Sequence, residues 1–257
     1  MCPDPALDPA GSSGRFHTTR WSLIVSSLDG EGDEAKAREA LAQLCRIYWR
    51  PIFFFIVRRG YSEADAQDLT QDFFLAILKH NLLQQADPER GRFRSLLLKS
   101  LQNFLNDAHA RTRSKKRGGD VQFVSWDDWA AEAPSRLTIP AAALESWPAE
   151  RLFDVRWAAT VAERALRHLQ EECESRGRRR VFDALSGALV AERAEISYDQ
   201  LARALGVGTP EIKRLLHQLR RRYRDLLRAE VADTVARKEE VEDELHHLVR
   251  ALAVTVG

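Results

Sequence analysis

The chain is poor in the residues that interrupt helices. Only 13 of its 257 residues are glycine and only 9 are proline. Few segments alternate apolar and polar residues in the way that half-buried strands do. Long windows instead repeat apolar residues at intervals of three and four, which is the spacing of one helix face. The sequence therefore predicts an all-α fold and disfavours architectures built on sheets.

Cysteines and long apolar runs are also scarce. The three cysteines, Cys2, Cys45 and Cys173, are far apart and lack zinc-ligand spacing, which favours free thiols in a reducing compartment. The first fifteen residues lack the apolar segment of a signal peptide. The most apolar run, Ile52–Val57, is too short to cross a bilayer. We therefore expect a soluble, cytoplasmic protein that does not enter a membrane.

The sequence lacks the common catalytic motifs as well. It has no Walker-type glycine loop, no His-Glu-x-x-His motif and no Gly-x-Ser-x-Gly turn. His246 and His247 are adjacent, so on a helix they point to different faces and make a poor metal pair. We expect no catalytic residue, no metal and no cofactor, and we favour a binding role over an enzymatic one.

Charge is nearly balanced but strongly segregated. The formal net charge is only +1, while basic residues gather in Arg111–Arg117, Arg176–Arg180 and Lys213–Arg224 and acidic ones in Asp127–Glu150 and Glu239–Glu244. Such segregation indicates one face for phosphates and separate solvated or protein-facing surfaces. Ordinary solvated helix faces are the alternative until a DNA-binding motif accompanies the basic runs.

The pattern predicts five segments. Residues 1–15 are rich in Pro, Gly, Ser and Asp and are expected to be disordered. A helical domain follows over 16–117, then a linker over 118–150 in which the periodicity fades. A second helical domain is predicted over 151–228 and a C-terminal helical extension over 229–257.

Helix boundaries can be predicted at several points. Apolar spacing predicts helices over Ala35–Arg59 and Phe93–Ala110. Between them, Ser62 precedes acidic residues and is expected to cap the start of a further helix. Near the C-terminus, Ala229–Val254 is predicted to form one long amphipathic helix. Its apolar positions repeat like those of a coiled-coil seam, at Val241, Leu245, Leu248 and Leu252.

The most specific local pattern is a helix-turn-helix at Tyr198–Tyr223. The residues at its constrained positions are Leu201, Ala202, Leu205, Gly206, Val207 and Ile212. Ala202 is small where the second helix crosses, Gly206 permits a left-handed turn, and the aliphatic residues are expected to form a small core. Thr209 is expected to cap the second helix, with Pro210 at its first position.

A basic run on and beyond the second helix favours DNA binding over mere packing of two helices. We expect Lys213 and Arg214 to reach base edges, and Arg220–Arg224 to hold phosphates. The candidate DNA-contacting residues of this motif are Thr209, Glu211, Lys213, Arg214, His217, Arg220 and Arg221.

The first domain carries a second pattern. The segments Tyr48–Phe53 and Ser62–Phe74 resemble region 2 of the σ70 family, most closely the extracytoplasmic-function (ECF) type. Gly91–Arg94 and the helix that follows resemble the segment that melts and holds the −10 element. The helix-turn-helix block resembles region 4, which reads the −35 element. The resemblance covers about 41–117 and 152–227, and it implies core RNA polymerase and promoter DNA as partners and, as a family expectation, an anti-σ protein.

The resemblance assigns a polymerase-binding role to Asp68, Gln71, Asp72, Phe73 and Phe74. Asp68, Gln71 and Asp72 are spaced to share one helix face. A narrow apolar stripe cannot bury both phenylalanines, so we expect one of them to be an exposed interface anchor. The alternative is a solvated acidic face backed by two core aromatics.

The resemblance also assigns contacts with the −10 region to Arg92, Phe93, Arg94, Lys99, Asn103, Arg111 and Arg113. Phe93 either stacks on an unpaired base or belongs to the core, and the sequence leaves both readings open. Arg214 and Leu215 replace the serine and basic residue common in the family, so the usual −35 preference cannot be transferred.

The sequence favours a σ factor in transcription initiation. Two alternatives stay open: a stand-alone helix-turn-helix regulator, and a helical interaction protein that has lost promoter binding. The acidic C-terminal helix either covers a DNA- or polymerase-binding surface or extends the core of its own domain.

Overall fold

The computed structural model describes residues 34–79, 93–112, 146–191, 194–235 and 238–253. Every regular element in these ranges is helical, which confirms the predicted all-α fold. The predicted disordered N-terminus and most of the predicted linker lie outside them. The helices are α2 (Glu34–Arg58), α3 (Glu63–Lys79), α4 (Phe93–Thr112), α7 (Ala149–Ser175), α8 (Arg179–Leu185), α9 (Tyr198–Leu205), α10 (Thr209–Ala232) and α11 (Val241–Ala253), with short 3₁₀ turns at Ser186–Ala188 and Lys238–Glu240.

The predicted starts of α2, α3 and α4 agree with the structure to within a residue or two. Ser62 caps α3 as expected: its Oγ accepts a hydrogen bond from the Asp65 backbone N–H at 3.1 Å and donates one to the Asp65 carboxylate at 2.7 Å. None of the helices in the described ranges combines the length and the apolar character needed to span a membrane.

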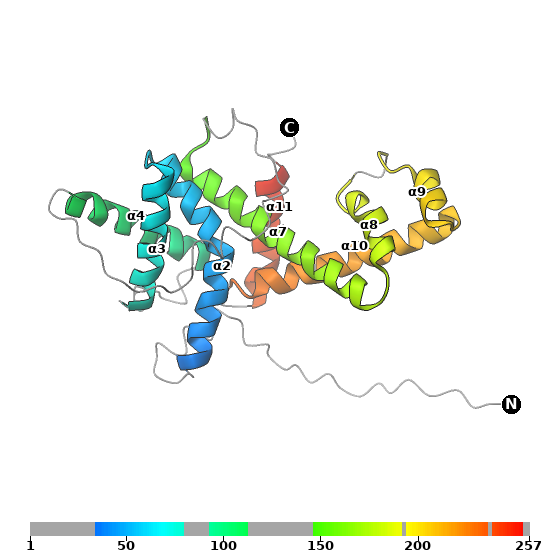
Figure 1. Ribbon diagram of the computed structural model, residues 1–257, viewed down its shortest axis with the longest axis horizontal. Coiled ribbons are helices and arrows are strands. Elements are labelled where there is room, and N and C mark those ends of the chain that lie inside the picture. The colour runs from blue at the N-terminus through cyan, green and yellow to red at the C-terminus, as the bar shows by residue number, and fades with distance from the viewer. Residues whose placement is uncertain (1–33, 80–92, 113–145, 192–193, 236–237, 254–257) are drawn as a thin grey trace.

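Helix α7 runs through the two larger hydrophobic cores of the described residues (Figure 1). Its first half contributes Phe153 and Trp157 to a core shared with α2, α3 and α4, and its second half contributes Leu169 to a core shared with α8 and α10. The first core therefore takes residues from both sides of the predicted boundary between 150 and 151. α7 connects the two cores, and α10 does so too, with Leu226 in the second core and Val231 in the first.

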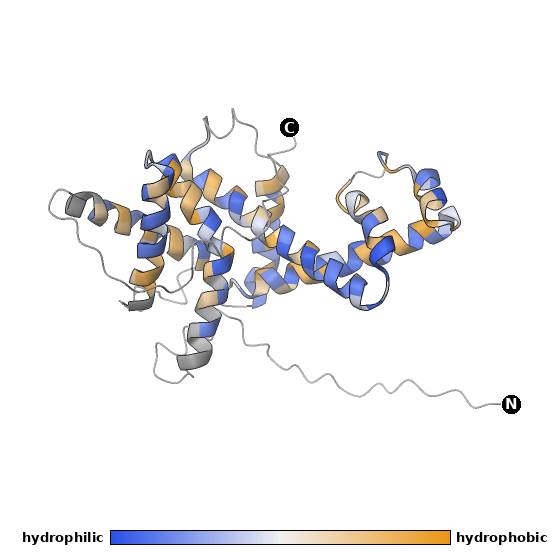
Figure 2. Cartoon of the chain, viewed as in Figure 1, coloured by the Kyte–Doolittle hydropathy of each residue, from blue (hydrophilic) through white to orange (hydrophobic). Residues whose placement is uncertain are grey.

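Helix α10 packs along α7 and returns toward the first core. A buried ion pair joins the two helices, with Arg164 Nε donating to Glu230 Oε2 at 2.9 Å. Val231, near the end of α10, already belongs to the first core. Hydrophilic and hydrophobic residues are interspersed along both helices (Figure 2), as expected for helices with one face in a core and one in solvent.

The C-terminal segment is not the single helix predicted over Ala229–Val254. α10 ends at Ala232, and α11 begins at Val241 after a 3₁₀ turn. At the break, the Thr234 hydroxyl donates to the Val231 carbonyl oxygen at 2.8 Å, so a side chain satisfies a terminal helix carbonyl. The break lets α11 fold back against α7 and α10, where Val241 and Leu248 join the first core.

Candidate nucleic-acid and polymerase interfaces

The turn between α9 and α10 has the geometry that the sequence predicted. Gly206 lies in the left-handed region, with φ 72° and ψ 31°, and its N–H donates to the Ala202 carbonyl oxygen at 2.9 Å. Gly208, however, is the N-cap of α10, and Thr209 is its first residue, so the expected capping role of Thr209 is wrong. The Thr209 hydroxyl instead donates to Asp199 Oδ1 at 3.2 Å and ties the two helices together.

The small core of the motif is only partly as expected. Ile212 and Leu216 of α10 are buried, and Leu201 of α9 packs against the second core. Val207, in contrast, is 38% exposed, so it does not take the core position that the motif assigned to it. The packing between α9 and α10 therefore depends on their helical residues more than on the turn.

One face of α10 is exposed and largely basic. Lys213, His217 and Arg221 follow one another at intervals of four residues and are all exposed, as is Arg214 beside them. Arg214 forms a bidentate pair with Glu211, with hydrogen bonds of 2.8 and 2.5 Å. Hydrogen bonds from the Arg214 guanidinium lower the pKa of the Glu211 carboxyl. Arg214 is thus held in a defined, solvent-facing position.

Arg220 does not belong to this face. Its guanidinium donates to the backbone carbonyl oxygens of Ala188, Leu189 and Ala191, at 2.8, 3.1 and 2.8 Å. It therefore holds the segment after α8 against α10, and its expected contact with phosphate stays a prediction. At least one residue of the basic run Lys213–Arg224 thus stabilises the fold.

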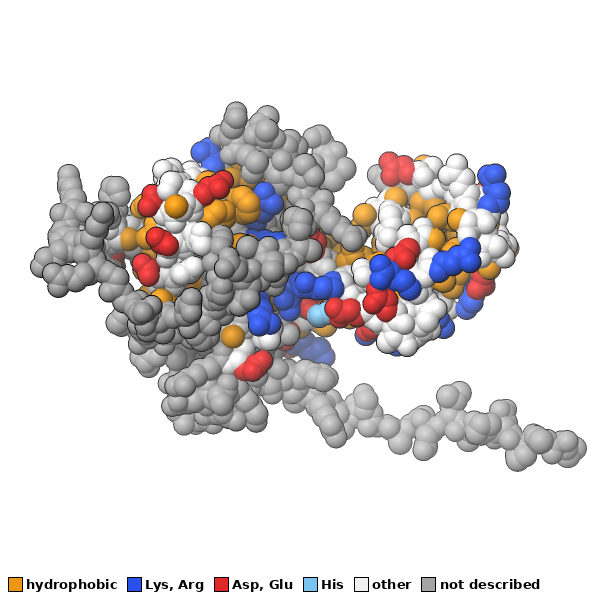
Figure 3. Space-filling view, in the orientation of Figure 1, with side chains coloured by type: hydrophobic (Ala, Val, Ile, Leu, Met, Phe, Trp, Pro, Cys, Tyr) orange, Lys and Arg blue, Asp and Glu red, His pale blue; other side chains and the backbone are white. Residues whose placement is uncertain are grey.

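Arg222 is also occupied, because it pairs with both carboxylate oxygens of Glu172 on α7. Figure 3 shows basic and acidic side chains interspersed around the helix-turn-helix end on the face that it draws. The exposed face of α10 is therefore one of several exposed basic positions at this end, which also include Arg178, Arg180 and Arg203.

Helix α3 presents the acidic face that the spacing predicted. Asp68 and Asp72 are exposed, and Gln71 beside them is half-buried. Phe73 and Phe74 are both buried, and Phe73 lies 5.4 Å from the ring of Phe104. The expectation that one of the two phenylalanines is exposed as an interface anchor is therefore wrong.

Helix α4 separates the residues predicted to contact the −10 region into two groups. Lys99 and Asn103 are exposed one turn apart, whereas Phe93 is buried with its ring centroid 5.2 Å from that of Tyr48. Of the two readings of Phe93, the structure supports the core residue. Arg92, Arg113 and the side chain of Arg111 lie outside the described residues.

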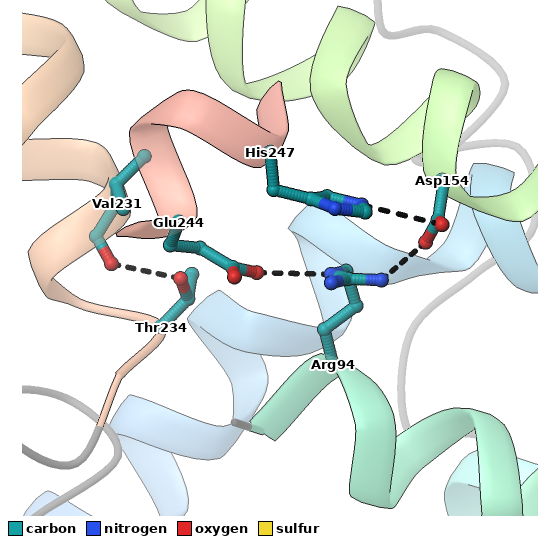
Figure 4. Close-up of polar contacts among 6 residues, drawn as sticks. All are labelled: Arg94, Asp154, Val231, Thr234, Glu244 and His247. Atoms are coloured by element: carbon teal, nitrogen blue, oxygen red, sulfur yellow. Dashed lines mark hydrogen bonds and ion pairs between the residues drawn. The ribbon is translucent and has the colours of Figure 1, made fainter. Parts of the chain in front are cut away.

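Arg94, the last of this set, is only 7% exposed and lies among three helices (Figure 4). Its Nε donates to Glu244 Oε1 of α11 at 2.9 Å, and its Nη1 pairs with Asp154 of α7. Asp154 Oδ2 in turn lies 3.2 Å from His247 Nε2 of α11. Burial disfavours the charged guanidinium, but the carboxylates of Asp154 and Glu244 outweigh that effect and raise the pKa of Arg94.

The sequence did not reveal these partners of Arg94. Asp154 and Glu244 lie 60 and 150 residues further along the chain, and only the acidic run Glu239–Glu244, which ends in the first turn of α11, hinted at a basic counterpart. The sequence also missed Gln218, which is exposed on α10 next to His217. Its position one turn after Arg214 was a signal that could have identified it.

The described residues form two hollows of note. A crevice of about 230 Å³ between α7, α8 and α10 is lined by residues that include Cys173, Leu215 and Leu219. A more open hollow of about 370 Å³ is lined by Arg59, Gly60, Tyr61, Leu105 and Asn106. Within the described ranges, no group of three or more His, Cys, Asp or Glu side chains could hold a metal ion.

The chain matches the model of a known protein family. The family model described as ECF sigma factor matches residues 31–229 and so includes both α3 and the helix-turn-helix. No curated protein and no solved structure matches the chain. α11 lies beyond the matched residues. Since the match covers most of the chain, the protein belongs to the family of ECF sigma factors, which act in transcription initiation with RNA polymerase and promoter DNA as partners and are not enzymes.

Proposed function

We propose that this sigma factor binds core RNA polymerase through the acidic face of α3, the −10 element through α4 and the −35 element through α10. The observation that carries the proposal is an exposed basic stripe on α10, the second helix of a helix-turn-helix. The stripe consists of Lys213, Arg214, His217 and Arg221. In such motifs the second helix enters the major groove, where an exposed polar face can contact base edges. The stripe lies within the residues that match the family.

At the −35 element, Lys213, Arg214, His217 and Arg221 are the candidates for DNA contact, with Gln218 added from the structure. Arg214 is a candidate for bidentate recognition of guanine, because Glu211 holds its Nε and Nη2 in place while the Nη1/Nη2 edge of the guanidinium keeps donors for a base. Glu211 and Thr209 then position other groups: Glu211 orients Arg214, and Thr209 fixes α9 to α10. Arg221 lies further along the same stripe and is suited to a phosphate.

At the polymerase, Asp68 and Asp72 are the candidates for direct contact because their carboxylates are exposed on one side of α3. Gln71 between them can add an amide hydrogen bond. Phe73 and Phe74 support this face from the core, since both pack beneath it. At the −10 element, Lys99 and Asn103 offer a cation and an amide one turn apart on the exposed side of α4.

The test is binding to core polymerase at moderate salt, followed by transcription from selected promoter sequences. The double variant Asp68→Asn/Asp72→Asn is expected to lose polymerase binding but to keep its affinity for DNA. The double variant Lys213→Ala/Arg221→Ala is expected to keep polymerase binding but to lose transcription. Glu171→Gln and Arg167→Ala, both at exposed positions on α7, are the matched controls and should behave like the wild-type chain.

The alternatives give different results. A stand-alone regulator binds DNA but not core polymerase. An interaction protein without promoter recognition binds polymerase but supports no transcription. If the wild-type chain does not bind core polymerase, the proposal is wrong.

A further inference from the structure

Four side chains meet where α2 packs against α7 (Figure 1). Arg50 and Phe54 lie about one turn apart on α2, and Arg156 and Glu163 lie about two turns apart on α7. Arg50 Nη1 is 3.7 Å from Glu163 Oε2, and the Cζ of Arg156 lies 3.9 Å from the centroid of the Phe54 ring. The contact between the two helices therefore brings two guanidinium groups and one carboxylate together.

The guanidinium of Arg156 is held in place but has an unused donor. Arg156 is half-buried and its Nε is enclosed, yet no acceptor among the described residues receives a hydrogen bond from this nitrogen. The Phe54 ring attracts the face of the cation, but it offers no acceptor in the plane of the N–H groups. An enclosed donor without an acceptor costs free energy. A ligand that accepts a hydrogen bond from Nε would remove this cost.

The electrostatic surroundings of Arg156 also favour an additional anion. Burial, the larger cause, and the positive charge of Arg50 lower the pKa of Arg156, and the carboxylate of Glu163 offsets only part of this effect. The distance of 3.7 Å between Arg50 and Glu163 exceeds that of a hydrogen-bonded ion pair. An anion near both arginines would be attracted by each of them and would reduce their mutual repulsion.

The chemistry and the exposure of this contact favour a phosphate group. A phosphate monoester carries roughly two negative charges near neutral pH and has three acceptor oxygens, so it can accept from two guanidinium groups at once. A carboxylate has one charge and two oxygens, and Glu163 already supplies one. The Arg50 side chain is only 11% exposed, which leaves little room for a phosphate that is flanked by sugars on both sides, as in a DNA strand.

We propose that Arg156 and Arg50 bind the free or terminal phosphate of a small molecule between α2 and α7. The residues of this site differ from those proposed to contact polymerase or DNA, so the inference does not depend on that proposal. The bound phosphate would join the two helices through both guanidinium groups. It would thereby strengthen the attachment of α7 to the first core.

The test compares Arg156→Met with Arg151→Met in the full-length chain, by urea denaturation in sodium chloride and in inorganic phosphate at the same pH and ionic strength. Arg151 is an exposed arginine of α7 that also lies over an aromatic ring, that of Trp147. At ten times the fitted Kd, phosphate should raise the folding equilibrium constants of the wild type and of Arg151→Met about tenfold more than that of Arg156→Met. The general effect of phosphate on protein stability is common to all three proteins.

The measurements in chloride test the unused donor itself. Methionine keeps an apolar stem against Phe54 and removes the enclosed guanidinium. Without phosphate, Arg156→Met should therefore be at least as stable as the wild type. A loss of stability in Arg156→Met that is the same with and without phosphate would make Arg156 a structural residue and overturn the proposal. Equal stabilisation of Arg156→Met and the wild type by phosphate would overturn it as well.

A further variant changes the anion that competes for the site. Glu163→Gln preserves the shape of the side chain but removes the negative charge beside Arg50, so phosphate should bind several-fold more tightly than to the wild type. Glu171→Gln, at an exposed position of the same helix, is the control and should bind phosphate like the wild type. An unchanged affinity in Glu163→Gln would place the bound phosphate elsewhere and contradict the proposal.

A single-stranded DNA oligonucleotide distinguishes the source of the phosphate. The wild type and Arg156→Met should bind it equally, because the site is too enclosed for a strand. If Arg156→Met weakens binding of the oligonucleotide while free phosphate leaves the stability of the wild type unchanged, the site serves nucleic acid and the proposal is wrong.

Discussion

Arg94 of α4 and Glu244 of α11 form a buried ion pair across 150 residues of sequence, with 2.9 Å between Nε and Oε1. With Asp154 of α7 on its other side, Arg94 is the cation that connects three helices at the edge of the first core. A buried charge of this kind is stabilising only while its partners are present.

Replacement of Arg94 by methionine therefore tests the structural part of this cluster. The methionine keeps an apolar stem but leaves two carboxylates, Asp154 and Glu244, without their shared cation. We expect the free energy of unfolding to fall by about 3–5 kcal/mol, as for other broken buried pairs. Urea denaturation measures it. Arg228→Met, which breaks the exposed pair with Glu242, is the control and should change stability little. Equal effects of the two variants would contradict a special role for Arg94.

Arg220 and Arg221 are adjacent, yet the structure predicts opposite effects for their substitution. Arg220 binds three backbone carbonyl oxygens, so Arg220→Ala should lower the free energy of unfolding by about 1–3 kcal/mol. Arg221 is exposed on the stripe that we propose to contact DNA, so Arg221→Ala should leave stability unchanged and reduce the slope of log K against log salt by about 1 for duplex DNA. Denaturation measures the free energy of unfolding of both variants, and DNA titration measures the salt dependence of their binding. A loss of stability with Arg221→Ala would show that the two roles are assigned wrongly.

Gly206 offers a test of the turn itself. Its φ of 72° is one that L-residues rarely adopt, while a Cβ at this position would meet no atom within 4 Å. Gly206→Ala should therefore destabilise the motif by about 1–2 kcal/mol through backbone strain alone. Gly206→Asn should cost less, because asparagine tolerates the left-handed region better. Unfolding monitored by circular dichroism compares the two, and an alanine variant as stable as the wild type would argue against the strain.

The sequence was informative where structure depends on neighbouring residues. The Ser62 cap, the left-handed Gly206 and the basic face of α10 are each set within one or two helical turns, and the structure agrees with all three. The all-α fold follows from the same local periodicity. These features need no knowledge of distant contacts.

The sequence was uninformative where distant elements meet. Phe73 packs beside Phe104 of α4, and Phe74 is buried next to Phe73. The prediction considered only one packing face of the helix, as for an amphipathic helix on a single core. Arg220 was indistinguishable from its basic neighbours until the carbonyl groups after α8 were located. The break at Thr234 has neither glycine nor proline, so no local signal marked it.

Because of Tyr223, the stability of the molecule depends on pH in the alkaline range. Its hydroxyl donates to the Ala162 carbonyl oxygen at 3.1 Å, which ties α10 to α7, and burial raises its pKa from 10.0 to about 12. Below about pH 10 the phenol is neutral in both the folded and the unfolded chain. Between pH 10 and 12 the unfolded chain loses the proton first, so the free energy of unfolding falls as the pH rises.

The Tyr223→Phe variant isolates this contribution. At neutral pH it should be less stable than the wild type by about 1 kcal/mol, because the hydrogen bond to Ala162 is lost. The difference should shrink as the pH rises through the interval between 10 and 12, since phenylalanine has no proton to lose. Urea denaturation of both proteins at neutral pH and at about pH 11 measures it. A difference that stays constant over this interval would show that the phenol of Tyr223 ionises equally readily in the folded and unfolded chains, and that α7 and α10 do not shield it.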